Sequence, residues 1–446
     1  MTRVFSADWV LPIEGPPIEA GAVVIEDGAI VVEDGLIAAV GAADDLGEGT
    51  RYDDAVIVPG FVNAHSHLEY AVYGGFGDGL GDFAEWITLH IQRKARIGWD
   101  EYVDVAKYGA AQCLASGVTT VGDCSYSGAT AVACAELGLR ATVYLEVFGA
   151  DPARALEHFA GIRDRVGDAF SARVRPGVSP HAPYSVSIEL YEACAELGLP
   201  IATHISESRA EVAYLLTGAG AWGAYKDLLV ASPGKTGTRL LAEHDLLGPN
   251  LVAAHCVVLD EGEIGLLAST GTGVAHCPRS NGALGCGVAP LAELREAGAR
   301  VGVGTDSPAS APSFDFFEEL RSVLLSARAR AGRPDVLSTS EALELGTLGS
   351  ARALGLDAEI GSLVPGKRAD FAIVSLEGPA YLPWEDPAGA VVLGGSPDRV
   401  IATYVDGEAR YEKGGMDWQE LTAAAHSARR AMLAQPAAKP VAAPRA

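Results

Sequence analysis

Residues 59–69 read PGFVNAHSHLE, and this stretch places His65 and His67 at the end of a predicted strand. Side chains two positions apart on a strand share a face, so both imidazoles point the same way. Neutral imidazole is a common protein ligand for divalent metals, and the pair therefore predicts part of a metal site on a rigid element. Several classes of metalloenzyme carry His-x-His, so the remaining ligands must come from elsewhere in the chain.

From Pro59 onward, short apolar strands alternate with helical stretches rich in Ala, Leu and Glu. This alternation is typical of parallel β/α units. Nearly every strand candidate ends close to a titratable residue, and the eight ends are His67, Asp123, Glu146, His181, His204, His255, His276 and Asp306. Eight such units predict a (β/α)8 TIM barrel, whose chemistry lies at the carboxyl ends of the strands.

The sequence on both sides of the predicted barrel is β-rich. The first 58 residues alternate apolar runs with Glu-Asp-Gly turns, and a similar texture returns in GSLVPGKRADFAIVSL and RVIATYVDGEARYEKG. We therefore expect an α/β fold with the barrel at residues 59–355 and a small β-sandwich domain made of residues 1–58 and 356–416. Residues 417–446 are predicted to begin as a helix and to end in an Ala- and Pro-rich tail.

Composition limits the kind of partner. The 446 residues carry 33 Lys and Arg against 58 Asp and Glu, a net charge of −25 that would repel nucleic acid and anionic membranes. We therefore expect a small-molecule partner. No signal-like leader and no apolar run of transmembrane length is evident, which predicts a cytoplasmic protein. The seven cysteines show no CxxC pairing, which argues against a disulfide framework.

Further candidates for the metal site follow at later strand ends. His204 ends IATHIS, with Glu207 three residues later, while His255 ends LVAAHC and Asp306 ends VGVGTDS. A single histidine at a strand end is equally well explained as a hydrogen-bonded polar cap. The ordered set at one rim of a barrel instead favours a metal site. A metal held by three imidazoles and a carboxylate lowers the pKa of a bound water from 15.7 toward about 7.

The motifs PGFVNAHSH, HISES, HC, GTDSPAS and GSLVPGKRAD resemble those of the amidohydrolase superfamily, over nearly the whole chain. The similar branch contains cytosine, guanine, S-adenosylhomocysteine and triazine deaminases and chlorohydrolases. This resemblance implies the metal ligands His65, His67, His204 and Asp306, with His255 beside the metal-bound water and Glu207 as the proton shuttle.

The same resemblance bears on the metal count and the assembly. Binuclear relatives bridge two metals with a carboxylated lysine, and no lysine lies at a predicted strand end here. We expect one divalent ion, Zn²⁺ with Fe²⁺ as the alternative, and Glu146 is the group that could recruit a second. Because relatives form dimers or larger assemblies, a homodimer is an expectation for this chain.

The residue types also suit ring deamination. Attack on an aromatic carbon that carries an amino group requires an acid for the neighbouring ring nitrogen, and Glu207 fits that role. His255 can hold the attacking oxygen by a hydrogen bond, while Asp306 can take its proton and pass it to departing ammonia. Zinc deaminases of another fold also use a glutamate that is not a ligand.

Candidate substrate contacts come from the loops at the same rim. VSPHAPYSVS places His181 and Tyr184 there, and Trp86 could form a wall for a flat ring, although core packing explains a tryptophan as well. Arg279 in AHCPRSN could grip a substrate carboxylate or serve as a structural charge.

HLE, HAPYSVS and CPRSN together are most similar to aminodeoxyfutalosine deaminases. That similarity implies conversion of 6-amino-6-deoxyfutalosine to futalosine and ammonia in menaquinone biosynthesis. The substrate is an adenine nucleoside with a carboxyphenyl ketone, so Arg279 would bind the carboxylate and Glu69 a ribose or base edge.

Three alternatives remain open. The first is an S-adenosylhomocysteine or methylthioadenosine deaminase, or another aminopurine or pyrimidine deaminase. The S-adenosylhomocysteine and methylthioadenosine enzymes carry a ribose-binding glutamate about nine residues after a tryptophan, where this chain has Ala95, which disfavours ribose binding of that kind. Hydrolysis of another leaving group, as in triazine chlorohydrolases or cyclic-amide hydrolases, is disfavoured by Glu207, because ring deamination needs an acid for the ring nitrogen whereas amide-cleaving relatives usually need a second metal. A non-catalytic metal-binding scaffold is disfavoured because Asp306 and Glu207 are both present.

Overall fold

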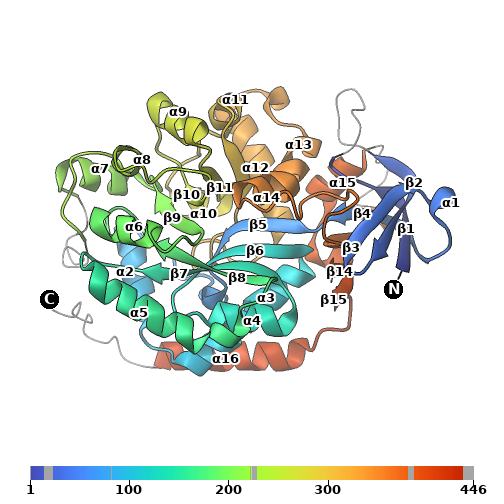
Figure 1. Cartoon of the computed structure of the whole chain (residues 1–446), viewed down its shortest axis with the longest axis horizontal. Helices are drawn as coiled ribbons and strands as arrows, with labels where there is room; N and C mark the ends of the chain where they lie inside the picture. Colours follow the sequence, from blue (N-terminus) through green and yellow to red (C-terminus); the bar gives the residue numbers. More distant parts are fainter. Residues whose placement is uncertain are drawn as a thin grey trace.

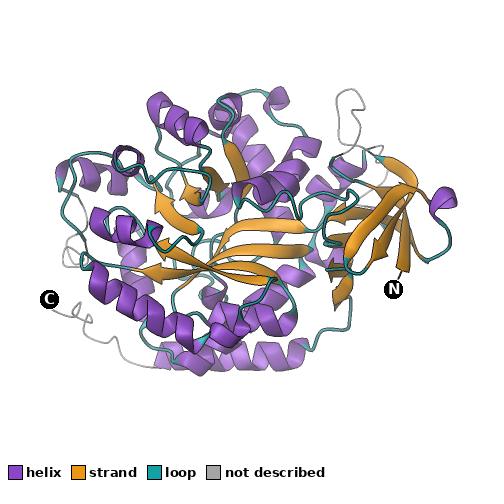
Figure 2. Ribbon diagram, viewed as in Figure 1, coloured by secondary structure: helices purple, strands orange, loops and turns teal. Residues whose placement is uncertain are grey.

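The chain folds around two sheets that lie next to each other (Figures 1 and 2). The computed structural model describes residues 2–14, 24–81, 83–220, 222, 229–379 and 386–434. One sheet has eight strands, each parallel to its neighbours, and the other has seven strands of mixed direction. The first sheet forms the barrel.

The barrel strands follow one another around the sheet in chain order. They are β5 (Phe61–Ser66), β6 (Val118–Ser125), β7 (Arg140–Val147), β8 (Val174–Pro180), β9 (Ile201–Ile205), β10 (Leu251–His255), β11 (Gly273–His276) and β12 (Arg300–Val303). Most of them are buried along their whole length, as expected for parallel strands covered on both faces.

The two edge strands meet, so the barrel is nearly closed. Ser66 pairs with Asp306, and the Asp306 N–H donates to the His65 carbonyl oxygen at 3.0 Å. Gly304 permits this approach, because a Cβ atom there would lie 2.8 Å from the Cβ of His65. The predicted TIM barrel is therefore confirmed.

The helices surround the barrel and connect its strands (Figure 2). Those between β5 and β10 are α2 (Phe83–Lys94), α3 (Trp99–Ala115), α4 (Ala129–Leu137), α5 (Pro152–Arg165), α6 (Ile188–Ala195), α7 (Arg209–Thr217) and α8 (Gly237–Glu243). Those after β10 are α9 (Glu261–Thr270), α10 (Pro278–Ala283), α11 (Leu291–Glu296), α12 (Phe316–Ala331), α13 (Thr339–Glu344) and α14 (Ser350–Ala353). Local sequence sets their ends: the side chain of Asp315 caps α12 at the backbone N–H groups of Phe317 and Glu318, and Gly332 ends it in a left-handed conformation.

The second sheet combines strands from both chain ends in the order β15-β14-β13-β4-β1-β2-β3. These strands are β1 (Thr2–Val10), β2 (Ile25–Glu33), β3 (Leu36–Ala42), β4 (Thr50–Pro59), β13 (Phe371–Ser375), β14 (Val400–Val405) and β15 (Glu408–Glu412). Antiparallel pairing of β4 with β13 joins the two ends, and Phe5, Phe371 and Tyr404 pack in the core of this domain. The prediction of a small β domain from both chain ends is confirmed.

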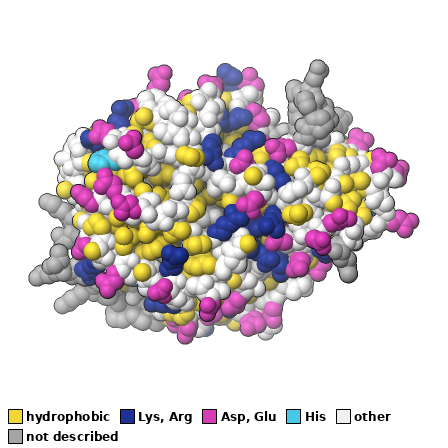
Figure 3. Space-filling model, in the orientation of Figure 1, with side chains coloured by type: hydrophobic (Ala, Val, Ile, Leu, Met, Phe, Trp, Pro, Cys, Tyr) yellow, Lys and Arg dark blue, Asp and Glu magenta, His cyan; other side chains and the backbone are white. Residues whose placement is uncertain are grey.

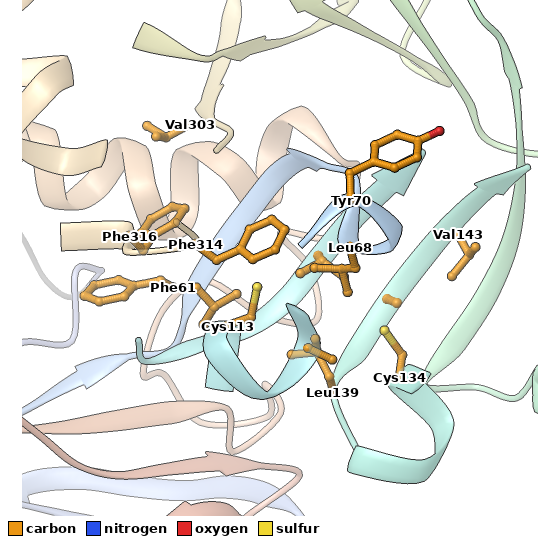
Figure 4. Packing of buried hydrophobic residues seen from close by; sticks show 14 of the residues in the cluster. Phe61, Leu68, Tyr70, Cys113, Cys134, Leu139, Val143, Val303, Phe314 and Phe316 are labelled. Atoms are coloured by element: carbon orange, nitrogen blue, oxygen red, sulfur yellow. The ribbon is translucent and has the colours of Figure 1, made fainter. Parts of the chain in front are cut away.

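Buried residues of the barrel form a continuous core (Figure 4). Phe61 stacks on Phe316 with ring centroids 5.3 Å apart and meets Phe317 edge-on at 5.2 Å. All seven cysteines are free and buried.

Three further helices lie outside the two groups named above. These are α1 (Ala43–Leu46), α15 (Pro387–Gly394) and the C-terminal α16 (Trp418–Ala434), which packs along α3. The predicted Ala- and Pro-rich tail, residues 435–446, lies outside the described residues. Across the described ranges, we find no helix with the length and apolar character needed to cross a bilayer.

Candidate metal centre

The structure brings four side chains from distant segments to one point at the carboxyl end of the barrel. His65 and His67 come from the end of β5, His204 from β9, and Asp306 from the segment after β12. The Nε2 atoms of His67 and His204 are 3.3 Å apart, and Asp306 Oδ1 lies 3.5 Å from His67 Nε2 and 3.7 Å from His65 Nε2. Two nitrogen ligands at 2.0–2.1 Å from one tetrahedral ion would be about 3.3 Å apart, so this spacing suits a single ion.

The chemistry of these donors also fits a divalent cation. His65 Nε2 is buried and has no hydrogen-bond partner among the described residues. His204 Nδ1 is 2.7 Å from the His181 carbonyl oxygen and can donate to it, which leaves Nε2 available as a ligand. Burial lowers the pKa of His67 to about 4 and that of His204 to about 3, so both rings are neutral at pH 7, as ligation requires.

His255 and Glu207 lie at the side of this group. His255 belongs to a second potential ligand set with His65 and Asp306. Its Nδ1 is 3.0 Å from Asn281 Oδ1, and its Nε2 is 3.8 Å from Glu207 Oε1. Burial, followed by the charges of Asp306 and Glu211, raises the pKa of Glu207 well above its ordinary value. A carboxyl in this state can donate a proton near neutral pH.

The backbone around the centre adopts an uncommon conformation. Ser206, His255, Cys256 and Asp306 have φ values of 52°, 72°, 50° and 56°, although none of them is glycine. Left-handed φ is costly for such residues and is often found at functional sites. Here it turns the chain sharply at the ends of three strands and directs side chains toward one point.

Two sets of supporting hydrogen bonds were not predicted. Asp123 is fully buried and accepts from Ser66 Oγ at 2.8 Å, the Leu68 N–H at 2.7 Å and Thr130 Oγ1 at 2.7 Å, which holds the turn after β5. Ser280 and Ser310 both donate to Asp306 Oδ2, at 2.7 and 2.8 Å, and leave Oδ1 facing the histidines. Asp123 was recognised only as a strand end, because its partners are scattered along the sequence.

Three of the predicted substrate contacts lie near the centre. The His181 ring centroid is 4.8 Å from that of His204, and Tyr184 is 5.7 Å from His181. Trp86, on α2, donates from Nε1 to the Ala309 carbonyl oxygen at 3.0 Å and stacks on His90. This hydrogen bond fixes the Trp86 ring against the segment that follows Asp306.

The structure argues against the substrate roles of Glu69 and Arg279. Glu69 is fully buried and accepts hydrogen bonds from the Ser125 hydroxyl and from the N–H and hydroxyl of Ser127. Arg279 donates to the carbonyl oxygens of Ser313 and Asp315, both at 2.8 Å, and pairs with Glu318 and Glu319 at 3.3 Å. The polar atoms of both side chains are therefore hydrogen-bonded to, or paired with, other groups of the protein. The sequence motifs do not reveal these partners.

Glu146, considered as the anchor for a second ion, lies apart from the potential ligand sets. Among the described residues, the groups close enough to share an ion are His65 with His67 and His204, and His65 with His255 and Asp306. Glu146 is buried at the end of β7, and burial raises its pKa to about 7 despite the opposing charge of Lys94.

The sequence is similar to those of known nucleoside deaminases. The chain is 34% identical over 379 residues to a 5-methylthioadenosine/S-adenosylhomocysteine deaminase of Symbiobacterium thermophilum, covering 82% of this chain and 84% of the relative. It is 32% identical over 387 residues to a 5'-deoxyadenosine deaminase of Methanothermobacter thermautotrophicus, covering 84% and 86%.

Solved structures show the same architecture. An adenosine deaminase from Xanthomonas campestris with bound zinc superposes with a TM-score of 0.87 at 28% identity, over 97% of this chain and 98% of the other. A zinc complex of atrazine chlorohydrolase from Arthrobacter aurescens gives 0.81 at 24% identity over 95% and 99%, a likeness of fold alone.

A family model covers most of the chain as well. It describes the amidohydrolase family and matches residues 56–410, from β4 through β15. The expectation of a hydrolase that acts on carbon–nitrogen bonds is thereby confirmed. This chain belongs to the amidohydrolase family.

Proposed function

We propose that this enzyme removes the exocyclic amino group of an adenine nucleoside by hydrolysis and releases ammonia. The observation that carries the proposal is Glu207, a buried carboxyl with a raised pKa beside His255 and the candidate ligands. A ring deaminase needs such an acid for the ring nitrogen. The relatives named as deaminases of methylthioadenosine, S-adenosylhomocysteine and deoxyadenosine support the same class of substrate.

We assign the metal to His65, His67, His204 and Asp306, with one divalent ion, Zn²⁺ or Fe²⁺. When bound, such an ion supplies a water that is nucleophilic at neutral pH. The zinc in the related adenosine deaminase structure supports this assignment.

The remaining chemistry falls to side chains around the ion. Glu207 protonates the ring nitrogen beside the amino-bearing carbon, and His255 orients the attacking water by a hydrogen bond. Asp306 accepts one proton from that water and transfers it to the departing amino group, and the second proton, left on the new hydroxyl group, passes to Glu207 as the 6-oxo group forms. The new carbon–oxygen bond replaces the carbon–nitrogen bond, so the products are the 6-oxo nucleoside and ammonia.

Within this class we propose 6-amino-6-deoxyfutalosine as the substrate, which would place the enzyme in menaquinone biosynthesis. The motifs HLE, HAPYSVS and CPRSN support this choice. The relatives favour a second candidate, S-adenosylhomocysteine or methylthioadenosine, at 34% and 33% identity.

An absorbance screen tests the proposal, because conversion of adenine to hypoxanthine changes the ultraviolet spectrum. Zinc-loaded and iron-loaded enzyme would be assayed on adenosine, 5'-deoxyadenosine, methylthioadenosine, S-adenosylhomocysteine and 6-amino-6-deoxyfutalosine, with ammonia measured separately. We expect turnover that chelation abolishes and metal restores. Turnover of a chlorotriazine or a cyclic amide, with none of any adenine nucleoside, would overturn the proposal.

A further inference from the structure

Lys94, the last residue of α2, has an ammonium group that lies against two aromatic rings. Its Nζ atom lies 3.9 Å from the centroid of the Tyr126 ring and 4.9 Å from that of Phe148. In the described part of the chain, no hydrogen bond or carboxylate within 4 Å is found for this ammonium. A desolvated charge held only by aromatic faces is costly unless another group completes its surroundings.

The two rings beside Lys94 begin a row that leads to the candidate metal centre. Tyr126, Phe148 and His181 directly follow the neighbouring strands β6, β7 and β8, and His204 lies on the next strand. The ring centroids are 6.3 Å apart from Tyr126 to Phe148, then 4.9 Å to His181 and 4.8 Å to His204. The last two steps match the spacing of adjacent strands, and the three rings follow consecutive strands, so the row follows the rim of the barrel.

The first part of this row keeps accessible surface. Lys94, Tyr126, Phe148 and His181 are partly exposed, whereas the strand residues that precede the three rings are buried. The rings can therefore contact a bound molecule that lies along the rim with one end at the metal centre and the other at Lys94.

Neighbouring acidic groups do not neutralise Lys94 by contact. Burial lowers the pKa of the Lys94 ammonium, and the charges of Glu146 and Glu69 oppose that change from a distance. The Glu69 carboxylate is held by Ser125 and Ser127. Glu146, with a pKa near 7, is partly neutral at physiological pH and can donate to an oxygen rather than repel it.

We infer that Lys94 binds a carboxylate carried on the 5' substituent of the substrate. The inference rests on the proposed deaminase function, since it requires the adenine ring at the metal centre. The 5' substituent then passes Phe148 and Tyr126, and its carboxylate meets the ammonium. Lys94 thereby takes the role first considered for Arg279, whose guanidinium is occupied by the protein.

This assignment separates adenine nucleosides into two groups. Both 6-amino-6-deoxyfutalosine and S-adenosylhomocysteine carry a carboxylate beyond the 5' position, whereas methylthioadenosine and 5'-deoxyadenosine carry none. Lys94 thus determines specificity for the acidic group, and the preference of the wild-type enzyme between its two members identifies the source of the carboxylate.

The test compares Lys94→Met, Lys94→Arg and Lys107→Met with the wild-type enzyme. Lys107 is a matched control because its ammonium is paired with Glu136 at 2.5 Å. Loss of a charge-assisted hydrogen bond should lower kcat/KM of Lys94→Met about 10- to 100-fold for the preferred acidic substrate, chiefly through KM. For 5'-deoxyadenosine, kcat/KM of Lys94→Met should fall by less than about threefold. Lys94→Arg keeps the positive charge and should recover much of the activity on the acidic substrate. Lys107→Met should match wild type on both substrates.

A binding measurement makes the result independent of turnover. In the Glu207→Gln background, calorimetry should show the same 10- to 100-fold weaker binding of the acidic nucleoside when Lys94 becomes Met. Equal losses for acidic and neutral nucleosides, or none for either, would overturn the role of Lys94 and leave the deaminase proposal standing. Absence of adenine deamination by the wild-type enzyme would instead overturn the proposed function.

Discussion

At the residue scale, the site separates two environments for ionisable groups a few ångströms apart. Burial lowers the pKa of the histidines and so preserves their neutral, ligating form. It raises the pKa of Glu207, whereas His255, His67 and the hydroxyls of Ser280 and Ser310 keep the pKa of Asp306 below its ordinary value. The same rim therefore favours the acid form of Glu207 and the ionised form of Asp306, the combination that ring deamination requires.

Glu207→Gln tests the acid directly. The amide keeps the shape of the side chain but cannot transfer a proton, so we expect kcat to fall by about 10²- to 10⁴-fold. Metal content by elemental analysis should stay at the wild-type value, because Glu207 is not among the potential ligands. Wild-type turnover in this variant would remove Glu207 from the mechanism.

Glu211→Gln tests how the pKa of Glu207 is set. The Glu211 carboxylate accepts hydrogen bonds from the backbone N–H groups of Ser206 and Glu207, and its charge helps to raise the pKa of Glu207. Removing that charge should lower the pKa of Glu207, so the acid form is lost earlier as the pH rises. The alkaline limb of the kcat profile should move to lower pH, while the exposed control Glu261→Gln keeps the wild-type profile. A shift toward higher pH would contradict this assignment.

Residues whose role depends on strand position could be predicted from sequence, whereas those that depend on side-chain partners could not. His65, His204, His255 and Asp306 each follow an apolar run, so barrel topology alone brings them to one rim. Arg279 shows the limit, because its partners Ser313, Asp315 and Glu319 lie more than thirty residues away. Lys94 was not predicted as a site residue for a different reason: it lies on a helix rather than at a strand end.

At the element scale, α2 and α16 support the loop that follows the His-x-His motif. Phe76, in that loop, lies between the guanidinium groups of Arg93 on α2 and Arg429 on α16, at 4.4 and 4.9 Å. Arg429 also donates to the Val72 carbonyl oxygen. The C-terminal helix therefore contacts a segment within ten residues of the candidate ligands, a link that its Ala-rich sequence did not predict.

Met432→Ala measures how strongly α16 is anchored. Met432 is fully buried, whereas its neighbour Leu433 is 46% exposed. The truncation of Met432 should lower the free energy of unfolding by about 2–4 kcal/mol, measured by urea denaturation. Leu433→Ala, the matched control, should change it by less than about 0.5 kcal/mol. Equal effects at the two positions would show that the helix is not packed as described.

At the scale of the whole molecule, ion pairs join the barrel to the mixed sheet. Arg140, at the start of β7, binds Asp370 at 2.7 Å and Asp406 at 2.6 Å, and Arg173 binds Asp406 at 2.9 Å. On the face shown in Figure 3, Lys and Arg side chains gather near the junction of barrel and sheet, while Asp and Glu spread around the edge.

Arg140→Met tests the junction. The substitution keeps much of the side-chain volume but leaves Asp370 buried without its cation, so we expect a loss of about 3–5 kcal/mol in unfolding free energy at pH 7. Arg175→Met should cost at most about 1 kcal/mol, because its pair with Glu359 is partly exposed.

The pH dependence of that loss follows from the sign of the pKa shift. The guanidinium groups hold the pKa of Asp406 below its ordinary value, so its stabilising contribution is present above that value and is lost as the pH falls through the lowered one. Wild type should therefore lose stability in acid, whereas Arg140→Met, which has already lost most of the pairing, should have a flatter profile. The gap between the two proteins should narrow below about pH 4 as the carboxylates become protonated. A gap that stays constant from pH 7 to pH 3 would mean that Arg140 stabilises the junction by packing rather than by charge.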